Sequence, residues 1–194
     1  NMDYNVQYME DYLELKANAN NYTNLRGYLS ANTYRHGEDG MGSGNWCRLT
    51  ADKIGSFPAT GYAMATILAM ELGDDVTVAI VEASYPGSTI KTWIDADRYI
   101  AKYGNDADVQ KYKNYLAFFE ANGRCPTSKN DLSTFTDKWT LSMCYDAILA
   151  PLKGYKVKAV VWDQGSGDLS RYASYAELYA LMQETFNETL GTED

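Results

Sequence analysis

Two runs rich in β-branched and apolar residues stand out in the pattern of hydrophobic and polar positions. They are Val76–Val81, which is continuous, and Val157–Trp162, which is interrupted only by Lys158. A strand that is covered on both faces of a parallel sheet has this composition. The shorter segment Leu25–Leu29 is a further strand candidate. The pattern therefore predicts strands that are buried within a sheet.

Between these runs, apolar residues recur at helical spacing. One predicted helix spans Pro58 to Leu72, with Ser56 as its N-cap and Gly73 just past its end. The other predicted helices span Met9–Ala19, Ala107–Ala121, Ser142–Leu152 and Arg171–Leu190. Strands that alternate with helices favour a layered α/β fold with crossover connections. In such folds, ligands gather at the carboxyl ends of the strands.

Length and charge narrow the class of protein. The chain has 194 residues, which is enough for about one domain. Its 45% hydrophobic and 22% charged residues indicate a globular protein rather than a disordered one. With 17 basic and 26 acidic residues the net charge is −9, and there is no basic cluster, so we expect no nucleic-acid partner. The longest apolar stretch, Tyr62–Met70, is too short to span a membrane.

Cysteine and histidine are scarce. The three cysteines, Cys47, Cys125 and Cys144, have no paired spacing, and His36 is the single histidine. A structural zinc site needs clustered Cys and His ligands, so we expect no metal and no cofactor. His36 lies in a glycine-rich loop, which continues through Gly37–Gly44, and we interpret it as a residue of the surface or of a cleft rim.

The aromatic content is high, with 17 Tyr, 4 Trp and 5 Phe. One interpretation places these rings in the core and on a half-exposed surface. The other places them along a cleft, where aromatic faces stack on sugars while the tyrosine hydroxyls stay hydrated. Composition does not separate the two interpretations.

Two of the predicted strands lead into polar turns that contain glycine, Glu82–Thr89 and Asp163–Asp168. With their flanks, these turns resemble those of the sialate O-acetylesterase-type carbohydrate esterases, a branch of the SGNH hydrolases. Ser84–Trp93 is similar to the family's Ser-Trp-Gly-Gly-Thr-x-Ile-x-x-Trp block. Ala159–Gly165 is similar to its Gly-Val-Ile-Trp-Tyr-Gln-Gly strand and turn.

Two further stretches extend the resemblance over essentially the whole chain. Asn45–Tyr62 resembles the family's tryptophan-containing loop and its Phe-Ser-Ala-x-x-Tyr helix start, and Tyr145–Leu152 resembles its Tyr-Asn-Gly-Met-Ile-Ala-Pro-Leu helix. The order and spacing of the four stretches carry the resemblance, since no single one is specific. It implies one domain over residues 1–194 with the SGNH hydrolase fold. This fold is a three-layer α/β/α sandwich with a parallel, flavodoxin-like sheet.

The implied activity is removal of O-acetyl groups from sugars, of sialic acid or xylan type, through an acyl-serine intermediate. The resemblance places the Gly87 N–H and the Gln164 amide in the oxyanion hole; the alternatives are a plain turn glycine and a turn-capping amide. Trp93 and Trp162 are candidates for a wall of the sugar site or for the core. We expect these substrate-binding residues: Tyr85, Ser88, Trp162 and Asp168.

The resemblance also locates the nucleophile and the base. The family's nucleophile lies in Gly-Gln-Ser-Asn-Met, and this sequence opens with Asn1-Met2, so we expect the serine immediately before Asn1. The family's Asp-x-x-His block would follow Asp194. We therefore expect the chain to be a piece of a longer one, because its sheet would lack a central first strand. A companion polypeptide segment that supplies this strand is the alternative.

Departures from the family pattern leave a second function open. Pro86 replaces a glycine and removes a backbone donor, and Ser166 replaces a glutamate. A catalytically inactive glycan-binding or structural module on the same fold is therefore the alternative. Ser84 and Ser88 are the nearest candidates for a nucleophile within the chain, but we interpret them as turn hydroxyls that cap the backbone. We expect an acetylated carbohydrate as the partner, no membrane association, and an extracellular or periplasmic location.

Overall fold

The computed structural model describes residues 4–30, 33–37, 40–42, 44–135 and 137–192. Its residues group into two compact units. The first comprises residues 1–31, 42–86 and 161–163, and the second comprises residues 32–41, 87–160 and 164–194. The expectation of a single domain over 1–194 stays a prediction.

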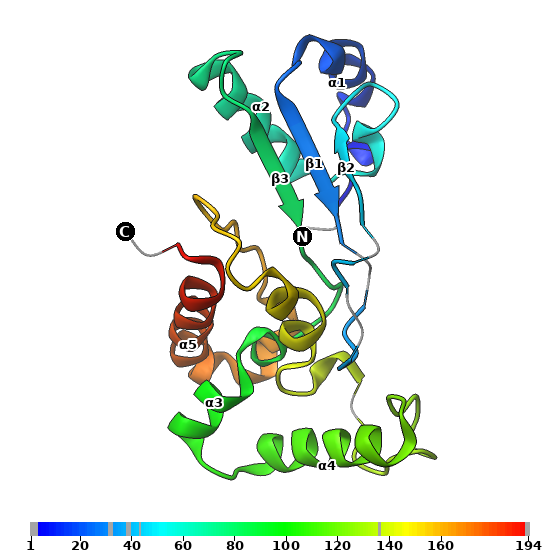
Figure 1. The fold of residues 1–194 in the computed structure, drawn as a ribbon, viewed down its shortest axis with the longest axis vertical. Coiled ribbons are helices and arrows are strands. Elements are labelled where there is room, and N and C mark those ends of the chain that lie inside the picture. The colour runs from blue at the N-terminus through cyan, green and yellow to red at the C-terminus, as the bar shows by residue number, and fades with distance from the viewer. Residues whose placement is uncertain (1–3, 31–32, 38–39, 43, 136, 193–194) are drawn as a thin grey trace. The chain divides into compact units, whose positions relative to one another are not determined.

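The first unit is built around a small mixed sheet (Figure 1). Its strands lie in the order β2-β1-β3, with β1 antiparallel to β2 and parallel to β3. Its strands and α-helices are α1 (Tyr12–Asn18), β1 (Leu25–Leu29), β2 (Trp46–Arg48), α2 (Ala59–Leu72) and β3 (Val78–Glu82). Its 3-10 helices are η1 (Val6–Tyr8), η2 (Ala19–Asn21) and η3 (Ile54–Ser56).

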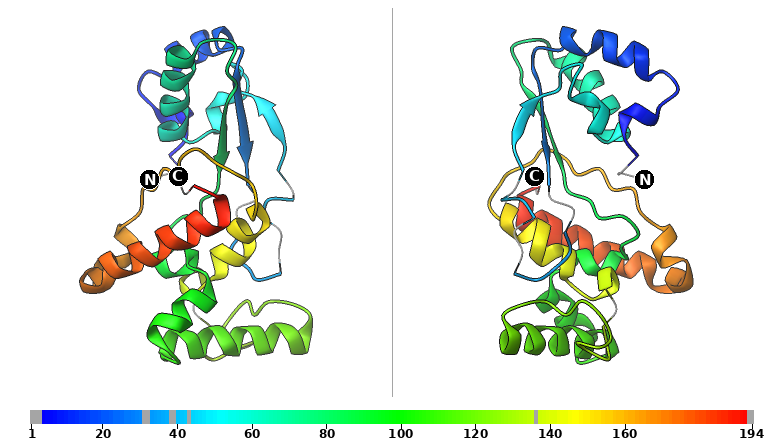
Figure 2. Two further views of the ribbon diagram at one scale, coloured as in Figure 1. Left: turned by 60° about the vertical axis from the view of Figure 1, so that its left-hand side comes forward. Right: turned by 90° about the vertical axis from the view of Figure 1, so that its right-hand side faces the viewer.

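Direct pairing of β1 with β3 organises this unit. Leu25 is opposite Val78 and Leu29 is opposite Glu82, so the ladder has no gap for a strand between them. The expectation that the sheet lacks a central first strand stays a prediction. Figure 2 shows α1 and α2 on the same face of the sheet. The core on this side includes Leu25, Phe57 and Tyr62, each at most 2% exposed.

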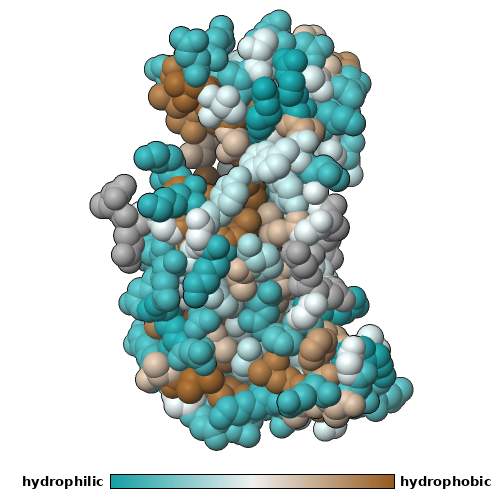
Figure 3. All heavy atoms as spheres, viewed as in Figure 1, coloured by the Kyte–Doolittle hydropathy of each residue, from teal (hydrophilic) through white to brown (hydrophobic). Residues whose placement is uncertain are grey.

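Helix α2 confirms the predicted helix and its end at Gly73. The helix runs to Leu72, and Gly73 follows with a φ of 78°, a conformation that glycine adopts without steric cost. Ser56 does not cap it, because its hydroxyl donates to the Lys53 carbonyl oxygen instead. Figure 3 shows apolar side chains gathered over α2. The exposed apolar residues of this helix are Met64, Ile67, Leu68, Met70 and Leu72.

The second unit is mostly helical among its described residues. Its α-helices are α3 (Ala96–Tyr103), α4 (Ala107–Asn122) and α5 (Tyr172–Leu190). Its other helical segments are η4 (Ile90–Trp93), η5 (Asp137–Trp139), the π-helical η6 (Tyr145–Leu149), η7 (Ala150–Leu152) and η8 (Ser166–Arg171). The predicted helices at 107–121 and 171–190 are confirmed, and the one predicted for 142–152 divides into η6 and η7.

Aspartate side chains begin two of these helices. Asp95 accepts a hydrogen bond from the Arg98 N–H at the start of α3, and Asp106 accepts bonds from the N–H groups of Asp108 and Val109 at the start of α4. Such caps satisfy backbone donors that the helix itself leaves unpaired. They fix where α3 and α4 begin.

The core of the second unit forms around η4. Ile90, Ile94, Leu141 and Ile148 are all fully buried. Lys91 is also buried, at 3% exposure of its side chain, and its Nζ lies 2.5 Å from Asp108 Oδ1. Desolvation lowers the pKa of Lys91 while Asp108 opposes that change. Because an unpaired buried ammonium is costly, this pair holds η4 against α4.

The strand predicted for Val157–Trp162 does not form. These residues have no strand assignment, and Val160 and Val161 are 40% and 38% exposed. A strand needs a neighbour that accepts and donates backbone hydrogen bonds, and no described strand pairs with this segment. The prediction is therefore wrong for this chain. The fold is α/β, whereas the three-layer arrangement with a parallel sheet stays a prediction.

Two findings complete the fold. None of the three cysteines forms a disulfide; Cys125 and Cys144 are buried, and Cys47 is partly buried. Among the residues that the structure describes, no helix has the length and apolar character needed to cross a membrane.

Candidate functional site

The turn that follows Pro86 supplies the backbone of the candidate site. Gly87 has a φ of 68°, and Ser88 and Thr89 are 5% and 3% exposed just before η4. Ser88 Oγ accepts a hydrogen bond from Trp93 Nε1 at 2.9 Å. Trp93 is only 2% exposed. The tryptophan therefore belongs to the core, and its indole fixes the Ser88 side chain.

Gln164 reaches this turn from a position 76 residues further along the chain. Its Nε2 donates to the Ser88 carbonyl oxygen at 3.0 Å and to Asp168 Oδ2 at 2.6 Å. Its Oε1 accepts from the Tyr175 hydroxyl at 2.9 Å. Since a side-chain amide has two N–H donors, both are used within the chain. A place for Gln164 in an oxyanion hole requires one of these bonds to break.

Asp168 joins the same cluster from inside the protein. It is 1% exposed, and its Oδ2 also accepts the backbone N–H of Ile90 at 2.8 Å. Among the described residues, none hydrogen-bonds to its other oxygen, Oδ1. A buried carboxylate that bonds a backbone donor holds the start of η4 in place. The geometry therefore makes Asp168 an anchor for the turn.

The backbone N–H of Gly87 is a hydrogen-bond donor that remains available. Its carbonyl oxygen accepts from Trp139 Nε1 at 3.0 Å, while no described residue accepts from its N–H. A backbone N–H that is held in place by its surroundings and has no partner can bind an oxyanion. The Gly87 N–H is therefore a backbone donor that the fold has placed but that no described residue uses.

The predicted site residues fall into two groups. Gly87, Ser88, Gln164 and Asp168 belong to the second unit and come together there. Tyr85 and Trp162 belong to the first unit, and both are partly buried. Their substrate-binding roles stay predictions. The positions where we expected the nucleophile and the base adjoin residues 1–3 and 193–194, which lie outside the described residues.

Two residues beside Gly87 were not predicted. Trp139 bonds its carbonyl oxygen, and a Cβ placed on Gly87 would lie 2.9 Å from Lys138 Nζ. Neither residue has a distinctive place in the hydrophobic pattern. Their contact with Gly87 depends on tertiary folding, so no local signal in the sequence could have found them.

His36 was interpreted as a residue of the surface or of a cleft rim, and the structure places it in a polar cluster. Its Nδ1 lies 2.7 Å from Asp146 Oδ2, and its side chain is 32% exposed. Asp146 also accepts from the hydroxyls of Ser142, at 3.1 Å, and Tyr112, at 3.3 Å. The hydrogen bond to Asp146 raises the pKa of His36.

This cluster has the residue types of a hydrolytic triad but not its connections. A catalytic serine donates its proton to the histidine, whereas the Ser142 hydroxyl donates to Asp146. Ser142 is also fully buried and has a φ of 65°. The cluster therefore ties the segment around His36 to the helices and does not form a nucleophile.

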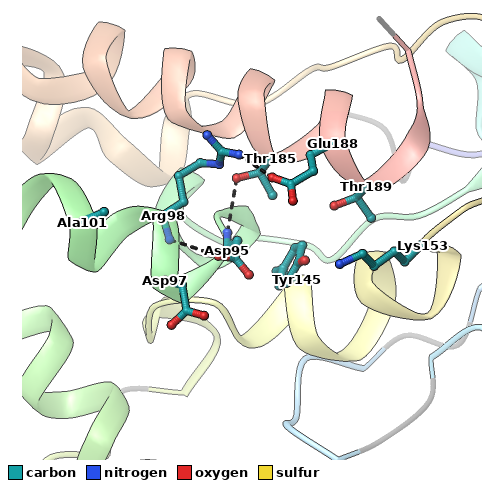
Figure 4. A pocket seen from close by; sticks show the side chains of 9 residues that line it. All are labelled: Asp95, Asp97, Arg98, Ala101, Tyr145, Lys153, Thr185, Glu188 and Thr189. Atoms are coloured by element: carbon teal, nitrogen blue, oxygen red, sulfur yellow. Dashed lines mark hydrogen bonds and ion pairs between the residues drawn. The ribbon is translucent and has the colours of Figure 1, made fainter.

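A polar pocket of about 370 Å³ opens elsewhere in the second unit (Figure 4). Arg98 Nη1 and Nη2 lie 2.6 Å and 2.5 Å from carboxylate oxygens of Glu184 and Glu188, and Asp95 caps α3. These charged groups already stabilise the fold. The pocket is lined by Asp95, Asp97, Arg98, Ala101, Tyr145, Lys153, Thr185, Glu188 and Thr189. No group of three or more His, Cys, Asp or Glu side chains suited to a metal ion occurs in the described part of the chain.

The elements define an α/β protein, and the buried turn of the second unit carries a polar cluster. In comparisons with known proteins, no family model and no curated protein matches the sequence. Among solved structures, the chain is similar to the crystal structure of a carbohydrate acetylesterase from Xanthomonas citri, with a TM-score of 0.71 and 22% sequence identity. The match covers 98% of this chain and 36% of that one, and it establishes a shared fold.

Proposed function

We propose that the protein containing this chain is a carbohydrate O-acetyl esterase that hydrolyses acetyl esters on sugars of sialic acid or xylan type. The observation that carries the proposal is that hydrogen bonds join two turns that are distant in the sequence. The Gln164 amide donates to the Ser88 carbonyl oxygen and to Asp168. Asp168 also accepts a hydrogen bond from the Ile90 N–H. The resemblance of these turns to those of sialate O-acetylesterases supports it. The shared fold with a carbohydrate acetylesterase adds support.

In the proposed mechanism a serine attacks the acetyl carbonyl carbon and a histidine takes its proton. Both residues come from the segments that the resemblance places before Asn1 and after Asp194. The oxygen of the tetrahedral intermediate accepts a hydrogen bond from the Gly87 N–H. The bond from the acetyl carbon to the sugar oxygen then breaks, the histidine returns its proton to that oxygen, and the acyl-serine remains. Water attacks the acyl-serine, gives its proton to the histidine and releases acetate, and the serine is restored. An oxyanion donor of this kind is worth roughly a hundredfold to a thousandfold in kcat.

One observation favours the second candidate, an inactive glycan-binding module on the same fold. Both N–H donors of Gln164 are used within the chain, and Pro86 has no N–H to offer. The oxyanion would then rely on Gly87 and on groups outside this chain. A module of this kind binds sugars without turning over esters.

The test uses the full-length protein that contains this chain. We expect it to hydrolyse p-nitrophenyl acetate and acetylated xylo-oligosaccharide or O-acetylated sialic acid, and a serine-directed fluorophosphonate should abolish the activity. Sugar binding without turnover would favour the inactive module. Turnover that resists the fluorophosphonate would contradict the serine mechanism.

A glycine variant tests the site itself. Gly87→Ala strains a residue with a φ of 68° and brings its Cβ to 2.9 Å from Lys138 Nζ, so we expect kcat to fall roughly a hundredfold. Gly123→Ala is the matched control, since Gly123 has a φ of 64° and nothing lies within 4 Å of its Cβ position. Both variants should lose about 1 kcal/mol of stability. An equal loss of activity in the two would contradict the assigned site.

A further inference from the structure

Trp139 is a large apolar side chain that remains half outside the protein. It is 51% exposed at the end of η5, whereas Trp93 is 2% exposed. The only polar atom of its ring, Nε1, donates to the Gly87 carbonyl oxygen at 3.0 Å. An indole whose N–H is engaged in this way has a restricted orientation, although half of its surface meets solvent.

The hydrogen bond ties this exposed ring to the proposed oxyanion donor. Gly87 uses its carbonyl oxygen to hold Trp139, and its N–H has no partner among the described residues. The indole ring of Trp139 and the free N–H are therefore linked through the same residue, Gly87. A molecule that bonds the Gly87 N–H is brought next to the ring.

Lys138 adds a positive charge at the same place. Its Nζ and Cε lie 2.9 Å and 3.3 Å from the position that a Cβ on Gly87 would take. The ammonium thus lies beside the α-carbon of Gly87 in a protein whose net charge is −9. The surroundings of Gly87 therefore combine an aromatic ring, a cation and a free backbone donor.

We propose that Trp139 is the platform on which the sugar ring of the acetylated substrate stacks while the acetyl carbonyl oxygen bonds the Gly87 N–H. This inference rests on the proposed esterase function and names the subsite for the sugar. The C–H face of a pyranose packs on an aromatic face, and such contacts involve offset packing of apolar surfaces. The hydrogen bond between Trp139 and Gly87 keeps the stacked sugar ring beside the reacting ester.

The experiment compares two esters in the full-length protein. Xylose tetra-acetate carries a sugar ring that can stack, whereas ethyl acetate does not. We expect Trp139→Ala to raise KM for xylose tetra-acetate by about tenfold, from the loss of an aromatic contact, and to leave KM for ethyl acetate unchanged. Trp139→Phe keeps a ring but loses the indole N–H, so its KM for the sugar ester should stay within about threefold of wild type.

A matched control separates the platform from a general effect of removing an exposed tryptophan. Trp46 in β2 is 46% exposed and belongs to the other unit. We expect Trp46→Ala to change neither KM value. Circular dichroism verifies that all three variants fold. If Trp139→Ala does not fold, it is replaced by Trp139→Leu, which keeps an apolar side chain without a ring.

The outcomes distinguish this inference from the proposed function. Equal losses on both esters in Trp139→Ala and Trp139→Phe would show that Trp139 only positions Gly87, and would overturn the platform. Turnover of ethyl acetate without turnover of xylose tetra-acetate would also overturn the platform and leave the esterase intact. Turnover of neither ester would overturn the esterase, and the platform with it.

Discussion

His36 and Asp146 form a residue pair whose protonation can be followed directly, because His36 is the single histidine in the sequence. The hydrogen bond to Asp146 raises the folded-state pKa of His36 above its ordinary value of about 6.5. The pair therefore contributes its full stability below about pH 6.5. That contribution is lost as the pH rises through the folded-state pKa.

At this scale we predict the effect of Asp146→Asn. The variant removes the charge that favours imidazolium, so the NMR titration of His36 should move to lower pH. The free energy of unfolding at pH 5.5 should fall by about 1 kcal/mol, a modest value because the histidine is partly exposed. The difference in the free energy of unfolding between this variant and wild type should become smaller by pH 8.5. Asp97→Asn, an exposed carboxylate on α3, is the control. A wild-type pKa at or below 6.5 would contradict this prediction.

At the scale of elements, strand β1 packs closely on the core of the first unit through Gly27. A Cβ at Gly27 would lie 2.3 Å from two ring atoms of Phe57 and 2.7 Å from Leu49 Cδ2. Phe57 and Leu49 are themselves buried. The absence of a side chain at Gly27 is therefore what lets these two residues pack against the strand.

We predict that Gly27→Ala lowers the free energy of unfolding by about 1–3 kcal/mol, since overpacking displaces core side chains. Gly61 in α2 is the matched control, because its Cβ position lies 3.4 Å from Ile80 Cγ2, an ordinary contact. Gly61→Ala should be neutral or stabilising, since alanine is the better helix former. Urea unfolding of both variants measures the difference, and equal stabilities would refute the packing argument.

The elements that the sequence pattern predicted correctly are those with local signals. Helix α2 ends before Gly73 and α4 before Gly123, where glycine adopts a positive φ. The strand predicted for Val157–Trp162 failed because a strand depends on a distant partner. Helix α3 was missed, since it is only eight residues long and three of these are charged. A cap at Asp95 was the available signal.

The candidate site required more than local pattern. The resemblance, not periodicity, linked the turn at Gly87 with Gln164, and the hydrogen bond from Gln164 to Ser88 joins the two turns. No local signal could indicate that the amide of Gln164 would be fully used within the chain. Likewise, the contact between Trp139 and Gly87 joins residues that are 52 positions apart.

At the scale of the whole molecule, apolar surface and unpaired backbone remain. Residues of α2 and the segment Val160–Val161 are exposed, and β3 is an edge strand of the sheet among the described residues. An edge with a free row of donors and acceptors readily pairs with another segment. We propose that a further segment of the longer protein, or a companion polypeptide, covers these groups.

Hydrogen exchange tests this proposal. The backbone amides of Lys158–Val161 should exchange rapidly in the 194-residue chain and at least about a hundredfold more slowly in the full-length protein, where they would join a sheet. The amides of β1 are the control and should be protected in both. Rapid exchange of Lys158–Val161 in both proteins would refute the proposal.

The three cysteine thiols, which form no disulfide, have a practical consequence for studying the second unit. Cys47 lies in the first unit, while Cys125 and Cys144 are buried in the second. A thiol reagent modifies a buried cysteine only when its surroundings open. The rates of alkylation at Cys125 and Cys144 thus report the opening of the second unit, whereas Cys47, which is only partly buried, serves as an internal reference. Mass spectrometry of the modified peptides measures all of these rates in one sample, without any added label.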